Sequence, residues 1–179
     1  MKTNLTLILA ALLAFSCRTS PEESSKEVFD PEQEKEAILK MAGDRFGRML
    51  AAKTPKAVAQ VYTENTISEP VYMPQNGNIL VGREAIIEWG IEFFGEYDLT
   101  ADWDAGPYYD NWTVKKDLAI HQYVAKGYFI ERATGDSVRT DQKTTDIFHK
   151  INGEWLYASH SWNANRMDVV MFNPDCVRN

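Results

Sequence analysis

The residues of this chain that could do chemistry are carboxylates, histidines and aromatic side chains in stretches that favour β-structure. Glu69 precedes Pro70, and Asp146 lies in a long run of strand-forming residues. A carboxylate that is desolvated at a cavity has a raised pKa, so it can act as a general base or stay protonated and donate a hydrogen bond. We therefore expect Glu69 as a candidate base and Asp146 as a candidate donor. The alternatives are a solvated strand-edge carboxylate for Glu69 and pairing with Lys143, Arg139 or water for Asp146.

The three histidines all fall in predicted strands. They are His121, His149 and His160, and neither their spacing nor any nearby cysteine matches a zinc site, so no metal is expected. Strand alternation places His160 and Trp162 on one face of the last strand and Tyr157 on the other. His160 or His121 is a candidate acid–base or ligand-contact residue; otherwise each is a histidine satisfied within the sheet.

Aromatic side chains are concentrated in the second half of the chain. Most must fill the core, but Tyr and Trp also suit a ligand pocket, where a polar tip orients the ligand against apolar walls. The candidates for lining a pocket are Phe46, Trp103, Tyr128, His160 and Trp162. The glycines are scattered through turns and form no phosphate-binding loop, so no nucleotide or other cofactor is expected.

Three segments have helical spacing. Residues 32–53 place Ile38, Ala42 and Met49 on one apolar stripe. Thr54-Pro55 offers a capping residue and a first-turn proline for a second helix that ends near Tyr62. A third helix is predicted over residues 83–94, directly after a glycine. Helices therefore dominate the first half of the chain.

Strand-forming residues dominate the second half. The dipeptide Asn152-Gly153 is a strong hairpin signal. Helices first and strands afterwards indicate an α+β fold, in which a curved antiparallel sheet wraps over three N-terminal helices and encloses a cavity. The predicted strands cover residues 66–73, 100–105, 108–114, 118–131, 137–151 and 155–162.

The order of these elements, from Glu32 to Asn163, resembles the nuclear-transport-factor-2-like superfamily, which is also called SnoaL-like. Two local motifs are similar to it: Gly82-Arg83-Glu84-Ala85-Ile86-Ile87 opens the third helix, and Asn152-Gly153-Glu154-Trp155 joins the last two strands. The resemblance implies a cystatin-like α+β cone. It does not imply one activity, because the superfamily includes isomerases, cyclases, dehydratases, hydrolases and non-catalytic binding modules.

A closer comparison is with the ketosteroid isomerases. The segment Thr66-Ile67-Ser68-Glu69-Pro70-Val71 is similar to that family's Thr-Val-Glu-Asp-Pro-Val, which puts Glu69 at the base position. Asp146 then falls where the family has its neutral, hydrogen-bond-donating acid. Phe46 stands where the family has its oxyanion-binding Tyr, so the largest electrostatic stabilisation of an enolate is missing. Steroid isomerase activity is therefore not expected.

The N-terminal residues are typical of an exported lipoprotein. Residues 1–16 resemble a signal peptide, with an early Lys2 and an apolar run shorter than the roughly 20 residues of a spanning helix. Ala14-Phe15-Ser16-Cys17 resembles a bacterial lipobox, which implies cleavage before Cys17 and lipidation of its thiol. Arg18 rather than Asp after this cysteine favours the outer membrane. We expect a lipid-anchored protein of the bacterial cell envelope.

The rest of the chain divides into three parts: a flexible acidic tether over residues 17–31, one domain over 32–166 and a tail over 167–179. A formal net charge of -7 argues against nucleic acid as a binding partner. It also argues against binding to an anionic membrane surface, so we expect membrane contact only through the lipid anchor. We expect the domain to bind a small apolar or amphipathic molecule in its cone. The alternatives are a cofactor-free isomerase, cyclase or dehydratase that uses Glu69, and a non-catalytic protein-interaction module. The resemblance also implies homodimerisation through the outer face of the sheet.

Overall fold

Three helices form the first part of the domain. The computed structural model describes residues 29–74 and 79–166. Asp30 caps the first helix by accepting the Glu32 amide at 3.0 Å, and Thr54 caps the second. Gly82 precedes the third with φ +84°, a conformation that favours glycine. The helices are α1 (Pro31–Ala51), α2 (Pro55–Tyr62) and α3 (Arg83–Glu96), close to the predicted bounds.

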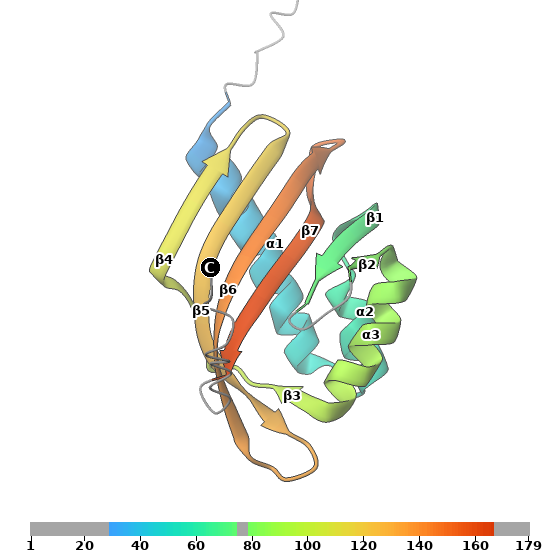
Figure 1. Cartoon of the computed structure of the whole chain (residues 1–179). Helices are drawn as coiled ribbons and strands as arrows, with labels where there is room; N and C mark the ends of the chain where they lie inside the picture. Colours follow the sequence, from blue (N-terminus) through green and yellow to red (C-terminus); the bar gives the residue numbers. More distant parts are fainter. Residues whose placement is uncertain (1–28, 75–78, 167–179) are drawn as a thin grey trace, which may run out of the picture.

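Seven strands form one sheet in the order β2-β1-β7-β6-β5-β3, and β4 also pairs with β5. Figure 1 shows the long strands curling around α1, with α2 and α3 beside β1. This arrangement confirms the predicted α+β class with a curved sheet over three helices. The strands are β1 (Thr66–Met73), β2 (Leu80–Val81), β3 (Tyr97–Leu99), β4 (Asp104–Val114), β5 (Leu118–Glu131), β6 (Ser137–Ile151) and β7 (Glu154–Arg166).

The sheet is mixed rather than wholly antiparallel. β1 pairs with β7 in parallel, with Tyr72 opposite His160. The hairpin signals that predicted the sheet report only on strands adjacent in sequence, so they could not reveal this pairing. The two strands predicted over residues 100–105 and 108–114 are also corrected. Residues 100–103 lie in no strand, and residues 104–114 form the single strand β4, whose register shifts between Ala105 and Asp110 near Gly106, at φ +86°.

The core consists of two clusters between the helices and the concave face of the sheet. One joins α1, α2 and α3 to β1, and the other joins α1 to β5, β6 and β7. The members of the first are Met49, Val58, Ala59, Tyr62, Tyr72, Ile86 and Phe94, and those of the second are Ile38, Ala119, Phe148, Trp155 and Tyr157. No helix within residues 29–74 and 79–166 is long and apolar enough to cross a membrane.

Candidate functional site

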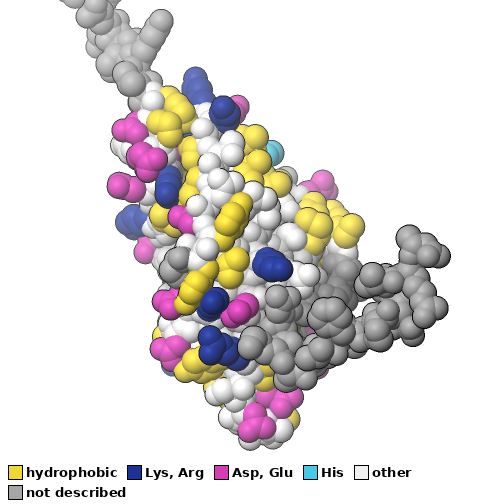
Figure 2. All heavy atoms as spheres, turned by 60° about the vertical axis from the view of Figure 1, so that its left-hand side comes forward, with side chains coloured by type: hydrophobic (Ala, Val, Ile, Leu, Met, Phe, Trp, Pro, Cys, Tyr) yellow, Lys and Arg dark blue, Asp and Glu magenta, His cyan; other side chains and the backbone are white. Residues whose placement is uncertain are grey.

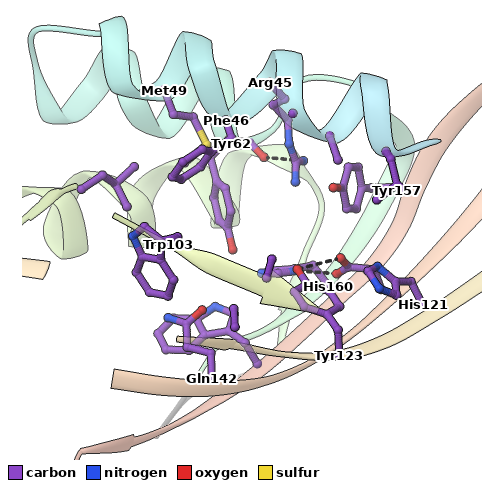
Figure 3. Close-up of a pocket in the computed structure, with 18 of the residues that line it drawn as sticks. Arg45, Phe46, Met49, Tyr62, Trp103, His121, Tyr123, Gln142, Tyr157 and His160 are labelled. Atoms are coloured by element: carbon purple, nitrogen blue, oxygen red, sulfur yellow. Dashed lines mark hydrogen bonds and ion pairs between the residues drawn. The ribbon is translucent and has the colours of Figure 1, made fainter. Parts of the chain in front are cut away.

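A cavity of about 370 Å³ lies between α1 and the concave face of the sheet. Its wall is largely aromatic and aliphatic, and the polar side chains labelled in Figure 3 come from α1, from the end of α2 and from β5, β6 and β7. Concave, mostly apolar sites with a few converging polar groups are where proteins bind small molecules. The polar residues of the wall are Arg45, Tyr62, His121, Tyr123, Gln142, Asp146, Tyr157 and His160.

An irregularity in β7 decides which of its side chains reach the cavity. The register between β6 and β7 shifts between Ile147 and Phe148, which pair with Ser159 and Tyr157, so Ala158 is an extra residue. Tyr157 and His160 consequently both line the cavity, although simple alternation placed them on opposite faces. The bulge adds a phenol to the same wall as the imidazole.

Asp146 and His160 form a hydrogen-bonded pair in this wall. They are directly opposite each other on β6 and β7, and His160 Nδ1 lies 2.5 Å from Asp146 Oδ1. The other carboxylate oxygen accepts from the Tyr123 hydroxyl at 3.3 Å. Asp146 is only 3% exposed, and such burial of a carboxylate is tolerated when both oxygens are hydrogen-bonded.

This pairing determines what His160 can do. When Nδ1 of a neutral imidazole donates this hydrogen bond to Asp146, Nε2 is left with its lone pair. The ring packs edge-on against Tyr62 and Tyr72, at centroid distances of 5.7 and 5.3 Å. These contacts hold the imidazole in one orientation. The arrangement can accept a proton from a bound molecule or a hydrogen bond from its hydroxyl.

His121 lies on β5, directly opposite Asp146 of β6. Its ring stacks on Trp112 at 3.8 Å and on Tyr123 at 4.2 Å, and its Nε2 contacts Asp110 Oδ1 at 2.7 Å. Burial lowers the pKa of His121, and the hydrogen bond to Asp110 opposes that shift only in part. His121 is therefore neutral at pH 7 and extends the aromatic wall of the cavity.

The phenols of the cavity are hydrogen-bond donors. Burial raises the pKa values of Tyr62, Tyr123 and Tyr157 above the ordinary value for tyrosine. Desolvation disfavours the charged phenolate, so these side chains stay protonated throughout the physiological range. Each can donate one hydrogen bond to an oxygen atom of a ligand or a neighbour.

Arg45 is a buried cation in the same wall. Its side chain extends from α1, and the residue is 5% exposed. Nη1 donates to the Tyr62 carbonyl at 3.2 Å and to the Tyr72 hydroxyl at 3.1 Å, and the guanidinium lies 3.7 Å from the Tyr157 ring centroid. These contacts connect α1 to the end of α2 and to the sheet.

Most of the sequence-predicted site residues come together at this cavity. Asp146, Phe46, Trp103, His160 and Trp162 all line it. They come from α1, from the segment before β4, and from β6 and β7. The structure thus brings the acid predicted on β6 next to a histidine predicted on the last strand.

Two predicted residues lie elsewhere. Glu69 is exposed and is not part of the cavity wall, because Pro70 and Tyr72 occupy the inward positions of β1 and alternation turns Glu69 outward. Tyr128 lies on the opposite face of β5 from the cavity-lining Phe129, and its hydroxyl donates to Asp102 Oδ2 at 2.5 Å. Glu69 therefore has the position of a solvated strand-edge carboxylate, and Tyr128 is not part of this cavity wall.

Sequence reasoning missed Arg45. The signal was available, because the buried residues of α1 are Ile38, Arg45 and Met49, and an arginine at this spacing interrupts the apolar stripe. A charged residue on the buried side of a helix indicates either a polar contact or a site. Among the described residues, no cluster of three or more metal-ligating side chains is found.

Comparison with known proteins supports the fold. No family model and no curated protein sequence matches the chain. A ketosteroid isomerase-like protein from Erwinia carotovora atroseptica is similar at TM-score 0.60 and 16% identity, covering 74% of this chain and 96% of its own. A protein from Streptomyces avermitilis, named a dehydratase of the NTF2-like family, is similar at TM-score 0.59 and 11% identity, covering 76% and 99%.

A third solved structure has the same architecture. It is a protein of unknown function with a cystatin-like fold from Nostoc punctiforme, similar at TM-score 0.57 and 15% identity, covering 75% of this chain and 93% of its own. At these identities the similarity shows the fold alone. The chain has the nuclear-transport-factor-2-like fold, a curved sheet over helices, as the sequence resemblance implied.

Proposed function

We propose that the domain binds a small amphipathic molecule in the cavity between α1 and the sheet. The observation that carries this proposal is the composition of the wall. Phe46, Trp103 and Trp162 form an apolar surface for the body of the ligand, and the Asp146–His160 pair offers hydrogen bonds to its polar end. A cavity of about 370 Å³ suits a molecule of one to three rings.

A cavity-filling variant tests the proposal. Ala125 lines the cavity on β5, so Ala125→Leu places three more carbon atoms where the ligand would lie. We expect this variant to bind the neutral fluorescent probe N-phenyl-1-naphthylamine at least about tenfold more weakly, a loss of about 1.4 kcal/mol. Fluorescence titration of the full chain measures the affinity, and native mass spectrometry of protein from its own host looks for a co-purified molecule.

Gln122→Leu is the matched control. Gln122 is exposed on the outer face of the same strand, so its replacement should leave probe binding unchanged. Equal probe affinity in wild type, Ala125→Leu and Gln122→Leu, with all three folded, would place the bound probe outside the cavity and contradict the proposal. A wild-type chain that binds no probe and carries no co-purified molecule would favour a protein-interaction module.

A second candidate function is cofactor-free acid–base catalysis. The 2.5 Å contact between Asp146 and His160 inside an apolar cavity favours it. His160 Nε2 would take a proton from the carbon next to a carbonyl group, Asp146 would stabilise the resulting imidazolium, and the protonated tyrosines would donate to the enolate oxygen. The base in this form is His160 rather than the exposed Glu69.

Proton exchange tests this second candidate without knowledge of the substrate. In deuterium oxide, a working base exchanges the α-hydrogens of a model ketone such as 2-indanone, which NMR follows directly. We expect His160→Gln to reduce catalysed exchange to the buffer rate, and Glu69→Gln to leave it unchanged. Wild-type exchange at the buffer rate would exclude 2-indanone as a substrate of such a base and leave ligand binding as the function.

We also propose that the domain is held in the bacterial cell envelope by lipidated Cys17. Cys17 and the signal segment lie outside the described residues, as does the tail after residue 166. The proposal is supported by the sequence of the lipobox-like segment and by the acidic tether that follows it. Such a tether would place the cavity within reach of molecules outside the cytoplasm.

A further inference from the structure

Arg45 is a buried charge that forms no ion pair with the residues that the structure describes. Its side chain is 5% exposed, and none of the ion pairs among residues 29–74 and 79–166 involves it. Arginine keeps its charge at every physiological pH. Burial of such a charge costs free energy unless hydrogen bonds and an opposite charge compensate it. Arg45 has hydrogen bonds to neutral groups and a ring face, but no carboxylate within 4.0 Å.

The hydrogen bonds of the guanidinium use one of its nitrogens. Nη1 donates to the carbonyls of Tyr62 and Glu64, at 3.2 and 3.5 Å, and to the Tyr72 hydroxyl at 3.1 Å. Within the described part of the chain, the hydrogen bonds of Arg45 leave the Nε and Nη2 donors available. These two N–H groups are parallel and lie on one edge of the planar group, which matches the two oxygens of a carboxylate.

Arg45 also faces the cavity in which we propose that a ligand binds. It belongs to the cavity wall, and Figure 3 shows its side chain extending from α1 toward the sheet, on the side where His160 lies. Asp146 is the acidic side chain of this wall, but its two oxygens already have hydrogen-bond partners in His160 and Tyr123. A ligand anion would therefore find Arg45 as its cationic partner.

We propose that the ligand is an amphipathic carboxylic acid, whose carboxylate Arg45 binds through Nε and Nη2 while its apolar body lies against the aromatic wall. This inference rests on the proposed binding function and names the chemical class of the ligand. The carboxylate neutralises the buried cation, and Tyr157, whose ring lies 3.7 Å from the guanidinium carbon, covers one face of the ion pair. Burial between ring and helix excludes water and strengthens the interaction.

A purely structural role of Arg45 makes a different prediction. If the guanidinium served only to join α1 to the end of α2, its removal would lower stability and weaken all ligands equally. If it binds a carboxylate, its removal changes the difference between a carboxylate and a neutral molecule of the same shape. The comparison of 2-naphthoate with 2-naphthamide isolates that difference, because the two differ only in the charged group.

The experiment is a calorimetric titration of the full chain with these two compounds. Titration with the uncharged N-phenyl-1-naphthylamine measures binding in the cavity independently of a carboxylate. We expect wild type to bind 2-naphthoate at least about tenfold more tightly than 2-naphthamide, the ratio of a charge-assisted over a neutral contact. In Arg45→Met, the ratio of the two affinities should fall to about one, while the affinity for N-phenyl-1-naphthylamine should stay at the wild-type value. Arg45→Lys should give an intermediate ratio, because lysine keeps the charge and loses the planar fork.

Arg48→Met is the matched control, since Arg48 lies on the same helix, is exposed and pairs with Glu64 at 2.8 Å. It should retain the wild-type ratio. Equal affinity of wild type for the two naphthyl compounds, with the neutral probe bound, overturns the carboxylate site and leaves the binding function intact. Failure of all three compounds to bind overturns both. If Arg45→Met does not fold, the affinity ratios of wild type and of Arg45→Lys for 2-naphthoate over 2-naphthamide still show whether Arg45 binds a carboxylate.

Discussion

Gly127 shows how one missing side chain shapes the cavity. A Cβ at this position of β5 would overlap the indole ring of Trp103. We expect Gly127→Ala to displace that ring and, through overpacking, to lower the free energy of unfolding by about 1–3 kcal/mol. The variant should also bind the neutral probe N-phenyl-1-naphthylamine more weakly. Urea unfolding and fluorescence titration measure the two effects.

Gly95→Ala is the control for this substitution. Gly95 lies in α3, and a Cβ there meets no atom within 4 Å, so the change should be neutral or slightly stabilising. If Gly127→Ala were as stable as wild type and bound the probe equally well, Trp103 would not depend on the glycine for its position. The cavity wall would then tolerate a shift of the indole.

The site could be predicted from sequence only in part. Asp146 and His160 were recognised by residue type and strand context, but their contact depends on the register of β6 against β7, which hydrophobic patterns do not specify to one residue. Helical spacing identifies apolar stripes, and by itself it does not show that a charged residue such as Arg45 is buried within one. Glu69 was placed by similarity of a short motif, and alternation in β1 turns it to the surface.

At the scale of elements, Glu34 joins the start of α1 to the sheet. Its carboxylate accepts from Lys150 Nζ at 2.6 Å and from Trp155 Nε1 at 2.7 Å. Desolvation alone would raise the pKa of Glu34, but these hydrogen bonds and the charge of Lys150 outweigh it and lower the pKa. A lowered pKa in the folded state stabilises the fold above the ordinary pKa of about 4.3, and this contribution is lost as the pH falls below it.

We therefore expect Glu34→Gln to cost about 1–2 kcal/mol at pH 7, and less as the pH falls below the ordinary pKa of glutamate, because the stabilising contribution of the wild-type carboxylate is lost there. Thermal unfolding monitored by circular dichroism across this range gives the two curves, which should converge toward low pH. Glu36→Gln, on the exposed face of α1, is the control and should leave the curve unchanged. A constant difference between Glu34→Gln and wild type at all pH values would show that shape, rather than charge, matters at this position.

The elements themselves were predictable to different degrees. The helices were found nearly at their observed bounds, because caps and apolar spacing are local signals. The turn Asn152-Gly153 joins β6 to β7 with φ values of +53° and +85°, as an Asn-Gly hairpin requires. The parallel pairing of β1 with β7 was not predicted, because nothing local connects two strands so far apart in sequence.

At the scale of the whole molecule, we propose that attachment to a membrane depends on Cys17, which lies outside the described residues. If Cys17 is lipidated, the mature chain begins with an acylated cysteine and partitions with membranes. We expect Cys17→Ser to abolish acylation and to release a protein whose probe affinity is unchanged. Mass spectrometry of the mature N-terminus in the native host measures this. An unmodified Cys17 in the wild-type protein would contradict it.

Homodimerisation through the outer face of the sheet stays a prediction at this scale. Figure 2 shows one face of the molecule, on which hydrophobic side chains are interspersed with acidic and basic ones. Tyr108 and Tyr109 on β4 are 54% and 51% exposed, and Lys126 Nζ lies 3.5 Å from the Tyr108 ring centroid. The molecular mass in solution, by light scattering, decides between one chain and two.

The position of β7 between β1 and β6 has a consequence for how the chain acquires its fold. β1 is made early, but the strand that it pairs with in parallel is the last element of the domain. The edge of β1 that pairs with β7 therefore has no partner strand until nearly the whole domain has been synthesised. Pairings of such long sequence separation slow folding. A chain that stops before Glu154 lacks both the parallel partner of β1 and the cavity residues of β7, so the sheet and the cavity are completed in the same late step.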